Sequence, residues 1–212
     1  MAGDVYIGRL DALDQTWQVW GELGGNLTAQ QWSRSTRCPG WDVACLYAHA
    51  SVFPMAMSPP PPVLNGPLGE PLTAVEVLRR FNAPDGVATT MAKTVADAAV
   101  REAAEHTRAH LIDRFTMHGS RAVHGLRKVE PTMVVPWPAS DGVMTLVEAL
   151  RIVLMEATVH LLDVQRALDY PPAVPVQALH DTAHLLAELA PAVELIEAAT
   201  GRSTHSPLPV LH

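Results

Sequence analysis

The sequence predicts an all-α protein, folded as an up-down helical bundle with one long irregular connection. Apolar residues recur at spacings of three and four along most of the 212 residues, as on the buried stripe of an amphipathic helix. Glycine and proline are concentrated in the stretches between these segments, and a β-like pattern is confined to Thr132–Val135. Helices that each bury one apolar stripe favour packing around a shared core.

Composition narrows the class of protein. Apolar residues make up 48% of the chain and charged residues 17%, a balance typical of globular proteins. The net charge of -7 gives no electrostatic reason to expect nucleic acid or a membrane as partner. Two cysteines form no disulfide framework, and neither a membrane span nor a signal core is visible, so we expect a cytoplasmic protein. It is expected to be a monomer or a homodimer.

The first predicted helix carries a regular apolar stripe, and Gly24 and Gly25 are expected to end it. Its apolar positions are Leu10, Leu13, Trp17, Trp20 and Leu23.

A second helix is predicted to begin near Trp41, with Asp42 in its first turn, where an acid suits the helix dipole. It should run through His49 to Pro54 and give way to the proline run at 59–62, which is incompatible with a helix.

The middle of the chain is less regular. A short helix is predicted over 73–81, capped by Thr73 with Glu76 three residues later. Residues 85–118 are alanine-rich and compatible with a helix, whereas 119–142 are expected to be irregular because glycine and proline punctuate them.

The strongest helix is predicted over 145–169, and a last helix over 174–200 with an interruption at Pro191. We therefore assign residues 1–170 to the bundle, and 171–212 to a C-terminal helix and tail packed on the same domain.

Three polar residues of the 145–169 helix share one face. Glu156 and His160 are four residues apart, Asp163 continues the same stripe, and their lateral neighbours on the helical wheel are apolar. Burying an uncompensated carboxylate costs several kcal/mol. A divalent metal is one way to compensate Glu156, since a Glu-x-x-x-His pair directs an oxygen and a nitrogen to a common point.

A third ligand would come from another helix, and His49 is the best candidate because its sequence neighbours are apolar. Three protein ligands with open positions are typical of a catalytic metal site. The residues alone leave a second interpretation open, in which Glu156 and His160 form a buried polar pair and His49 is a packing residue. Two further histidine pairs at the same spacing, His106/His110 and His180/His184, lie on polar faces and are not favoured as ligands.

Several motifs then occur in order along the chain. They are Trp32-Ser-Arg-Ser-Thr-Arg-Cys-Pro-Gly-Trp-Asp-Val-Ala-Cys-Leu-Tyr-Ala-His49, Val135-Pro-Trp-Pro138, Leu150-Arg-Ile-Val-Leu-Met-Glu-Ala-Thr-Val-His-Leu-Leu-Asp-Val-Gln-Arg-Ala-Leu168 and Ala198-Ala-Thr-Gly-Arg202. Taken together, from about Leu10 to Arg202, they resemble the mycothiol-dependent maleylpyruvate isomerase family.

The resemblance implies a DinB-like four-helix bundle in which His49, Glu156 and His160 bind a divalent metal. Zinc is the usual ion, and a His₂Glu site is also compatible with nickel, iron or cobalt. The implied cosubstrate is mycothiol, the low-mass thiol of actinobacteria. A metal lowers the pKa of a thiol and produces a thiolate for attack on a small electrophile, as in an S-transferase or a cis-trans isomerase.

The resemblance also suggests roles for other residues. Asp163 would orient a metal ligand or a bound water, and Arg202 would bind a carboxylate of mycothiol or of the substrate. A plain helix-surface acid and a solvated arginine are the alternatives. Cys45 stands where the family usually has Asp, and we expect simple packing for it. The proline run at 59–62 and the loop at 131–141 are expected to shape the substrate pocket.

Two other functions stay open at this point. A DinB-like metalloprotein could use another thiol or act as a hydrolase, and a helical protein without catalytic activity could serve as a binding or interaction module. The sequence does not identify the electrophile.

Overall fold

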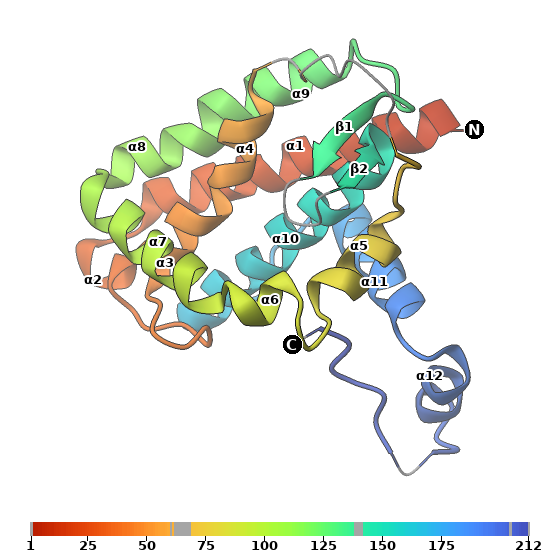
Figure 1. Ribbon diagram of the computed structural model, residues 1–212. Coiled ribbons are helices and arrows are strands. Elements are labelled where there is room, and N and C mark those ends of the chain that lie inside the picture. The colour runs from red at the N-terminus through yellow and green to blue at the C-terminus, as the bar shows by residue number, and fades with distance from the viewer. Residues whose placement is uncertain (1, 60, 62–68, 138–141, 204, 212) are drawn as a thin grey trace.

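The computed structural model describes residues 2–59, 61, 69–137, 142–203 and 205–211, and it shows a mostly helical, DinB-like bundle (Figure 1). Its first half contains α1 (Ala2–Asn26), α2 (Ala29–Trp32), α3 (Val43–Ala50), α4 (Val52–Met57), α5 (Ala74–Phe81), α6 (Val87–Thr90) and α7 (Ala92–Glu105). Its second half contains α8 (Arg108–Asp113), the π-helical turn η1 (Arg114–Gly119), α9 (Ser120–Leu126), β1 (Val134–Trp137), β2 (Gly142–Thr145), α10 (Leu146–Ala167), α11 (Val176–Leu189) and α12 (Ala192–Ala199).

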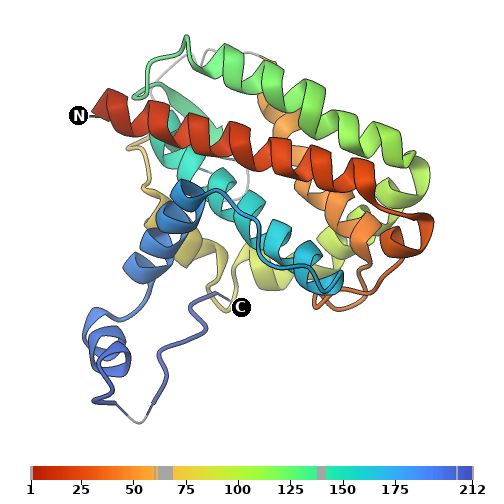
Figure 2. The ribbon, with the colours of Figure 1, turned by 180° about the vertical axis from the view of Figure 1, so that it is seen from behind.

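The bundle is built from α1, the pair α3–α4, the continuous run α8–η1–α9, and α10. Helix α1 packs against α10 and η1, α4 packs against η1, and α3 packs against α10 (Figures 1 and 2). Aromatic side chains fill the space between them: the Trp20 and Phe115 rings stack with centroids 4.9 Å apart, and the Tyr47 ring meets Trp20 edge-on. The indole N–H of Trp20 donates to the Ala157 carbonyl at 3.0 Å and so links α1 to α10.

The predicted end of the first helix is wrong, because α1 continues through Gly24 and Gly25 to Asn26. A Cβ at Gly24 would lie 2.9 Å from both Tyr47 Cε1 and Ile112 Cγ1. Gly24 therefore permits the close approach of neighbouring helices and does not terminate the helix.

The predicted end of the second helix at Pro54 is also wrong. Helix α3 ends at Ala50, and α4 begins at Val52, so Pro54 lies in the first turn of a new helix. The backbone N–H groups of a first turn have no partner within the helix, and proline is tolerated there.

The region 85–118 is helical but divided. Helix α7 ends before His106, and α8 starts after Thr107, whose hydroxyl accepts a hydrogen bond from the His110 N–H at 3.2 Å. The stretch expected to be irregular from residue 119 begins with a helix, α9, because its apolar side chains Ala122, Val123 and Leu126 are buried. Tertiary burial here overrides the glycine signal of the sequence.

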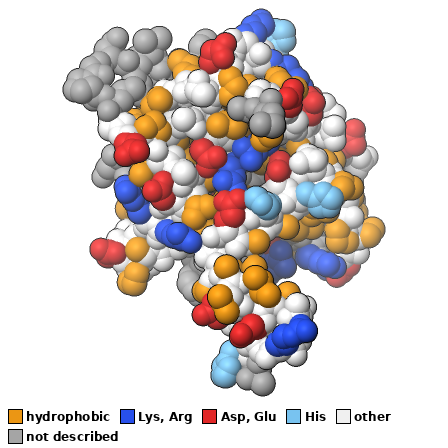
Figure 3. All heavy atoms as spheres, turned by 90° about the vertical axis from the view of Figure 1, so that its right-hand side faces the viewer, with side chains coloured by type: hydrophobic (Ala, Val, Ile, Leu, Met, Phe, Trp, Pro, Cys, Tyr) orange, Lys and Arg blue, Asp and Glu red, His pale blue; other side chains and the backbone are white. Residues whose placement is uncertain are grey.

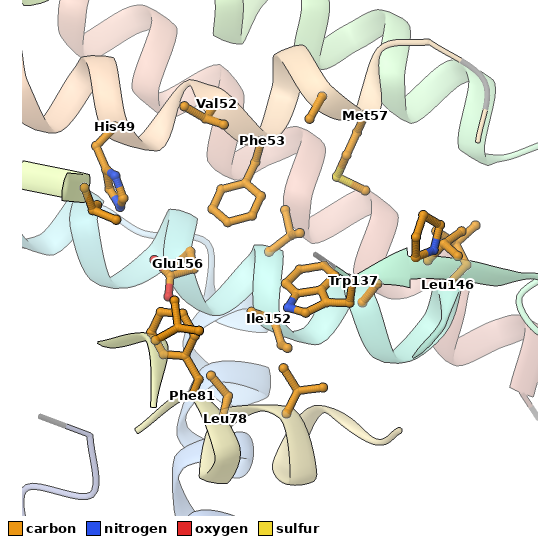
Figure 4. A pocket seen from close by; sticks show the side chains of 18 of the residues that line it. His49, Val52, Phe53, Met57, Leu78, Phe81, Trp137, Leu146, Ile152 and Glu156 are labelled. Carbon is orange, nitrogen blue, oxygen red and sulfur yellow. The ribbon is translucent and has the colours of Figure 1, made fainter. Parts of the chain in front are cut away.

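The β-like stretch lies two residues further along than predicted. β1 pairs antiparallel with β2, with Val135 opposite Met144 and Trp137 opposite Gly142. The hairpin places Trp137 beside α10, where it lines a cavity (Figure 4).

The remaining predicted helices are confirmed, with small shifts at their ends. Helix α5 has the capping box of Thr73 and Glu76, and α10 covers the longest predicted segment. Helix α11 packs against α10, α1 and α5, and Pro191 separates it from α12. Helix α12 packs against α11 and projects from the bundle (Figure 1). Figure 3 shows hydrophobic side chains on the lobe that projects at the bottom of the view.

Within the described residues, no helix combines the length and apolar character needed to cross a membrane.

Candidate metal centre

The first predicted ligand, His49, lies in the last turn of α3, whose start is fixed by a side-chain cap. The Asp42 carboxylate accepts a hydrogen bond from the Cys45 backbone N–H at 2.9 Å. His49 is half-buried, and Figure 4 shows its imidazole directed toward the helix that carries Glu156.

The other two ligands lie one turn apart on α10. Glu156 Oε2 is 3.4 Å from His160 Nε2. The rings of His49 and His160 are nearly perpendicular, with centroids 5.1 Å apart. One ligand-type atom from each of the three residues lies within 4.8 Å of the others. The structure therefore brings together the three residues that the sequence indicated.

Asp163, the acid that the sequence analysis expected to orient a ligand, contacts the ring of His160. Asp163 Oδ2 lies 3.0 Å from His160 Nδ1, which leaves Nε2 facing Glu156. Asp163 is only 4% exposed, so it is no surface acid. A carboxylate bound to the second ring nitrogen is the arrangement that fixes the tautomer and orientation of metal-binding histidines.

Two neighbours of Asp163 were missed by the sequence analysis. The Arg37 guanidinium forms an ion pair with Asp163 Oδ1, and the Cys38 thiol donates to Oδ2 at 3.6 Å. Cys38, His160 and Asp163 also hold ligand-type atoms within 4.8 Å of one another. Arg37 and Cys38 belong to the turn before α3, in which Gly40 adopts a positive φ of 80°. In the sequence, the one indication that Arg37 and Cys38 lie near the centre was that their turn precedes the helix that carries His49.

The protonation states of the two imidazoles differ. Burial lowers the pKa of His49 to about 4, so its ring is neutral near pH 7 and offers a lone pair. Burial also lowers the pKa of His160, but hydrogen bonds with Asp163, Cys38 and Glu156 outweigh this effect and raise it well above its usual value. Burial would raise the pKa of Glu156, yet the neighbouring His160 lowers it.

These residues fit a divalent metal. Among the described residues, the His49 imidazole takes part in no hydrogen bond, so its nitrogens are not committed elsewhere. Glu156 is ionised, and His160 holds a proton that a metal would displace. Two imidazole nitrogens and one carboxylate match the donor preferences of zinc and its first-row neighbours.

The centre opens onto a cavity of about 790 Å³, within the usual size range of small-molecule pockets. His49 and Glu156 form part of its wall, as Figure 4 shows. The Trp41 ring also lines the cavity and packs on the centre, with centroid distances of 4.9 Å to His49 and 6.4 Å to His160. A molecule in this cavity would therefore contact two of the three candidate ligands directly.

A family model, the mycothiol maleylpyruvate isomerase N-terminal domain, matches residues 13–165. The chain belongs to this family. The matched region contains His49, Glu156, His160 and Asp163, whereas residues 166–212 lie outside it. No curated protein and no solved structure shows significant similarity to the chain.

Arg202, which the sequence analysis expected to bind a carboxylate, does not line the cavity at the candidate metal centre. It is exposed just after α12, is absent from the described cavity wall, and donates a local hydrogen bond to the Thr200 carbonyl at 3.3 Å. Its expected role in binding a carboxylate stays a prediction.

Cys45 and the remaining histidine pairs are not among the groups of described residues whose ligand-type atoms converge. Cys45 is buried, and burial raises the pKa of its thiol to about 11, so it remains protonated near pH 7. His106 faces Glu102 at 3.2 Å, and His184 faces Glu188 at 3.0 Å, each within its own helical region.

The loops expected to shape the pocket contribute Pro59, Pro61, Pro136 and Trp137 to its wall, while residues 60, 62 and 138–141 lie outside the described part.

Proposed function

We propose that this chain is a metal-dependent enzyme that activates mycothiol for attack on a small electrophile, as an S-transferase or a cis-trans isomerase. The observation that carries the proposal is the convergence of His49, Glu156 and His160 at the wall of a large cavity. Membership of a family named for a mycothiol-linked isomerase supports it.

In this proposal, His49, Glu156 and His160 hold the metal. A bound divalent ion would lower the pKa of a thiol near it and supply a thiolate at neutral pH. Asp163 keeps the proton of His160 on Nδ1 and so presents Nε2 to the metal. Arg37 in turn holds the Asp163 carboxylate from its other oxygen.

Attack by a thiol on an electrophile in the cavity would have one of two outcomes, conjugation or isomerisation. In conjugation, the sulfur forms a bond to an electrophilic carbon, the electron pair of the carbon–carbon double bond moves toward the carbonyl, and the thiol's proton ends on the adjacent carbon. In isomerisation, the same addition is followed by rotation about the new single bond and loss of the thiol. Neither outcome consumes an oxidant or a reductant. The apolar walls exclude water, which would otherwise compete with the thiol.

The test begins with the metal content of the purified protein. We expect about one equivalent of a divalent metal in the wild type and in His180→Ala, an exposed histidine of α11, and strong loss in His49→Ala. Less than about a tenth of an equivalent in the wild type would reject the proposal.

The second part of the test concerns the thiol. Consumption of a model enone should be faster with mycothiol than with cysteine or bacillithiol, and it should disappear in His49→Ala. Equal rates with all three thiols would support the metal chemistry but reject mycothiol as the specific cosubstrate. A metal-loaded protein that accelerates none of these reactions would reject the enzymatic function itself.

A further inference from the structure

The walls of the cavity are almost entirely apolar. Apart from His49 and Glu156, every described residue that lines it is a hydrocarbon, proline, methionine or tryptophan side chain. Phe53 and Ile152 face each other across it from α4 and α10, and Leu78 and Phe81 approach from α5 (Figure 4). The described wall contains no lysine, arginine or neutral hydrogen-bonding side chain other than the tryptophans.

Two cations of the surrounding helices form ion pairs outside the cavity wall. Arg151 of α10 pairs with Glu148 and Glu188, on the side facing α11, and Lys93 of α7 pairs with Asp97 at 2.7 Å. A carboxylate that entered the cavity beyond the metal would lose its hydration without gaining a partner.

We infer that the electrophile of this enzyme is an uncharged, largely apolar molecule and not a dicarboxylate such as maleylpyruvate. This inference rests on the proposed function in taking the occupant of the cavity to be the reacting electrophile. The volume of about 790 Å³ accommodates an aromatic or aliphatic body of considerable size. The reactive carbon of that body would lie at the end formed by His49 and Glu156, where the thiol sulfur attacks.

A matched pair of enones tests the charge preference. Benzylideneacetone and benzylidenepyruvate share a phenyl ring and an enone, but the first carries a methyl group where the second carries a carboxylate. In titration calorimetry with the zinc-loaded protein, the neutral enone should bind at least about tenfold more tightly, since the cavity wall beyond the metal offers the carboxylate no cation. Equal or tighter binding of benzylidenepyruvate, or no binding of either compound, would overturn the inference.

A designed cation provides the internal control. Val95 of α7 lines the cavity and is 38% exposed, whereas Val100 of the same helix is 47% exposed and is not among the described lining residues. Val95→Arg should tighten benzylidenepyruvate by about tenfold and weaken benzylideneacetone, and Val100→Arg should change neither affinity. The same response in both variants, or none in Val95→Arg when its circular dichroism is unchanged, would reject the cavity as the binding site.

Different outcomes contradict the charge preference and the proposed function. Calorimetry measures binding without turnover. It therefore shows whether the protein prefers the neutral enone even if no reaction with a thiol is found. Conversely, a protein that holds metal and turns over maleylpyruvate with mycothiol faster than benzylideneacetone would overturn this inference and leave the proposed function intact.

Discussion

Asp163 Oδ2 lies 3.0 Å from Nδ1 of His160, and this contact decides which nitrogen of the ring is free to face Glu156. Because Asp163 is buried and ionised, it stabilises the His160 imidazolium, and under the proposed function it would orient the neutral ring when a metal replaces the proton. Under the proposed function, this contact would therefore couple metal affinity to pH and to the orientation of the ring.

Asp163→Asn should weaken zinc binding by about 10- to 100-fold, because the amide no longer supports the basicity of His160. Chelator competition measures the affinity. Asp169→Asn is the matched control: Asp169 lies just beyond the same helix, is exposed, and pairs with Arg34. Its positive φ of 58° is one that asparagine tolerates. Equal zinc affinities for the two variants would contradict the role of Asp163.

Metal binding should release about one proton at pH 7. His49 is already neutral because its pKa is lowered to about 4, and Glu156 is already ionised, so neither contributes. His160 is protonated because its pKa is raised, and it must lose that proton to bind the metal. Zinc affinity should therefore rise about tenfold per pH unit until the pKa of His160 is reached. Calorimetry in buffers of different ionisation enthalpy measures the release, which should decrease in Asp163→Asn.

Arg37→Met should reduce zinc affinity only a few-fold, since the Arg37 side chain is 59% exposed and its ion pair is partly screened by solvent. The effect should vanish in the Asp163→Asn background, because Arg37 acts through that carboxylate. Arg34→Met removes a similar exposed pair with Asp169 and should leave zinc affinity unchanged. Additive losses in the double variant would show that Arg37 acts by another route.

Adjacent glycines of α1 should respond in opposite directions to alanine. Gly24→Ala places a methyl group 2.9 Å from Tyr47 and Ile112, so the free energy of unfolding should fall by about 1–3 kcal/mol. Gly25→Ala meets nothing within 4 Å and should raise the free energy of unfolding by up to about 1 kcal/mol through helix propensity. Urea denaturation distinguishes the two, and stabilisation by Gly24→Ala would refute the close-approach explanation.

The parts of the centre differ in how far sequence could predict them. Glu156 and His160 were predictable from local periodicity, because a spacing of four on one helix fixes their relative direction. His49 lies on a different helix, and only its apolar neighbours and the family resemblance connected it to them. The contact of Arg37 with Asp163 joins residues 126 positions apart through the conformation of a turn, which no local pattern encodes.

The errors in the fold have a similar origin. Gly24 and Pro54 are helix breakers by intrinsic preference, yet one lies within a helix and the other in the first turn of one. Packing against Tyr47 and Ile112 explains Gly24, and the break at Ser51 explains Pro54. Sequence indicated two loops of the cavity wall, but the other lining segments could not be predicted for the same reason, since they come from throughout the chain.

Under the proposed function, the metal chemistry and the choice of electrophile would depend on separable parts of the protein. The candidate ligands belong to α3 and α10 of the bundle, while much of the opposite wall comes from α5, α6, α7 and the β1 strand. Mutation can thus reshape the accepted molecule from the periphery without disturbing the donors. Such a division makes the scaffold a natural starting point for directed evolution toward new electrophiles, with diversity confined to the outer wall.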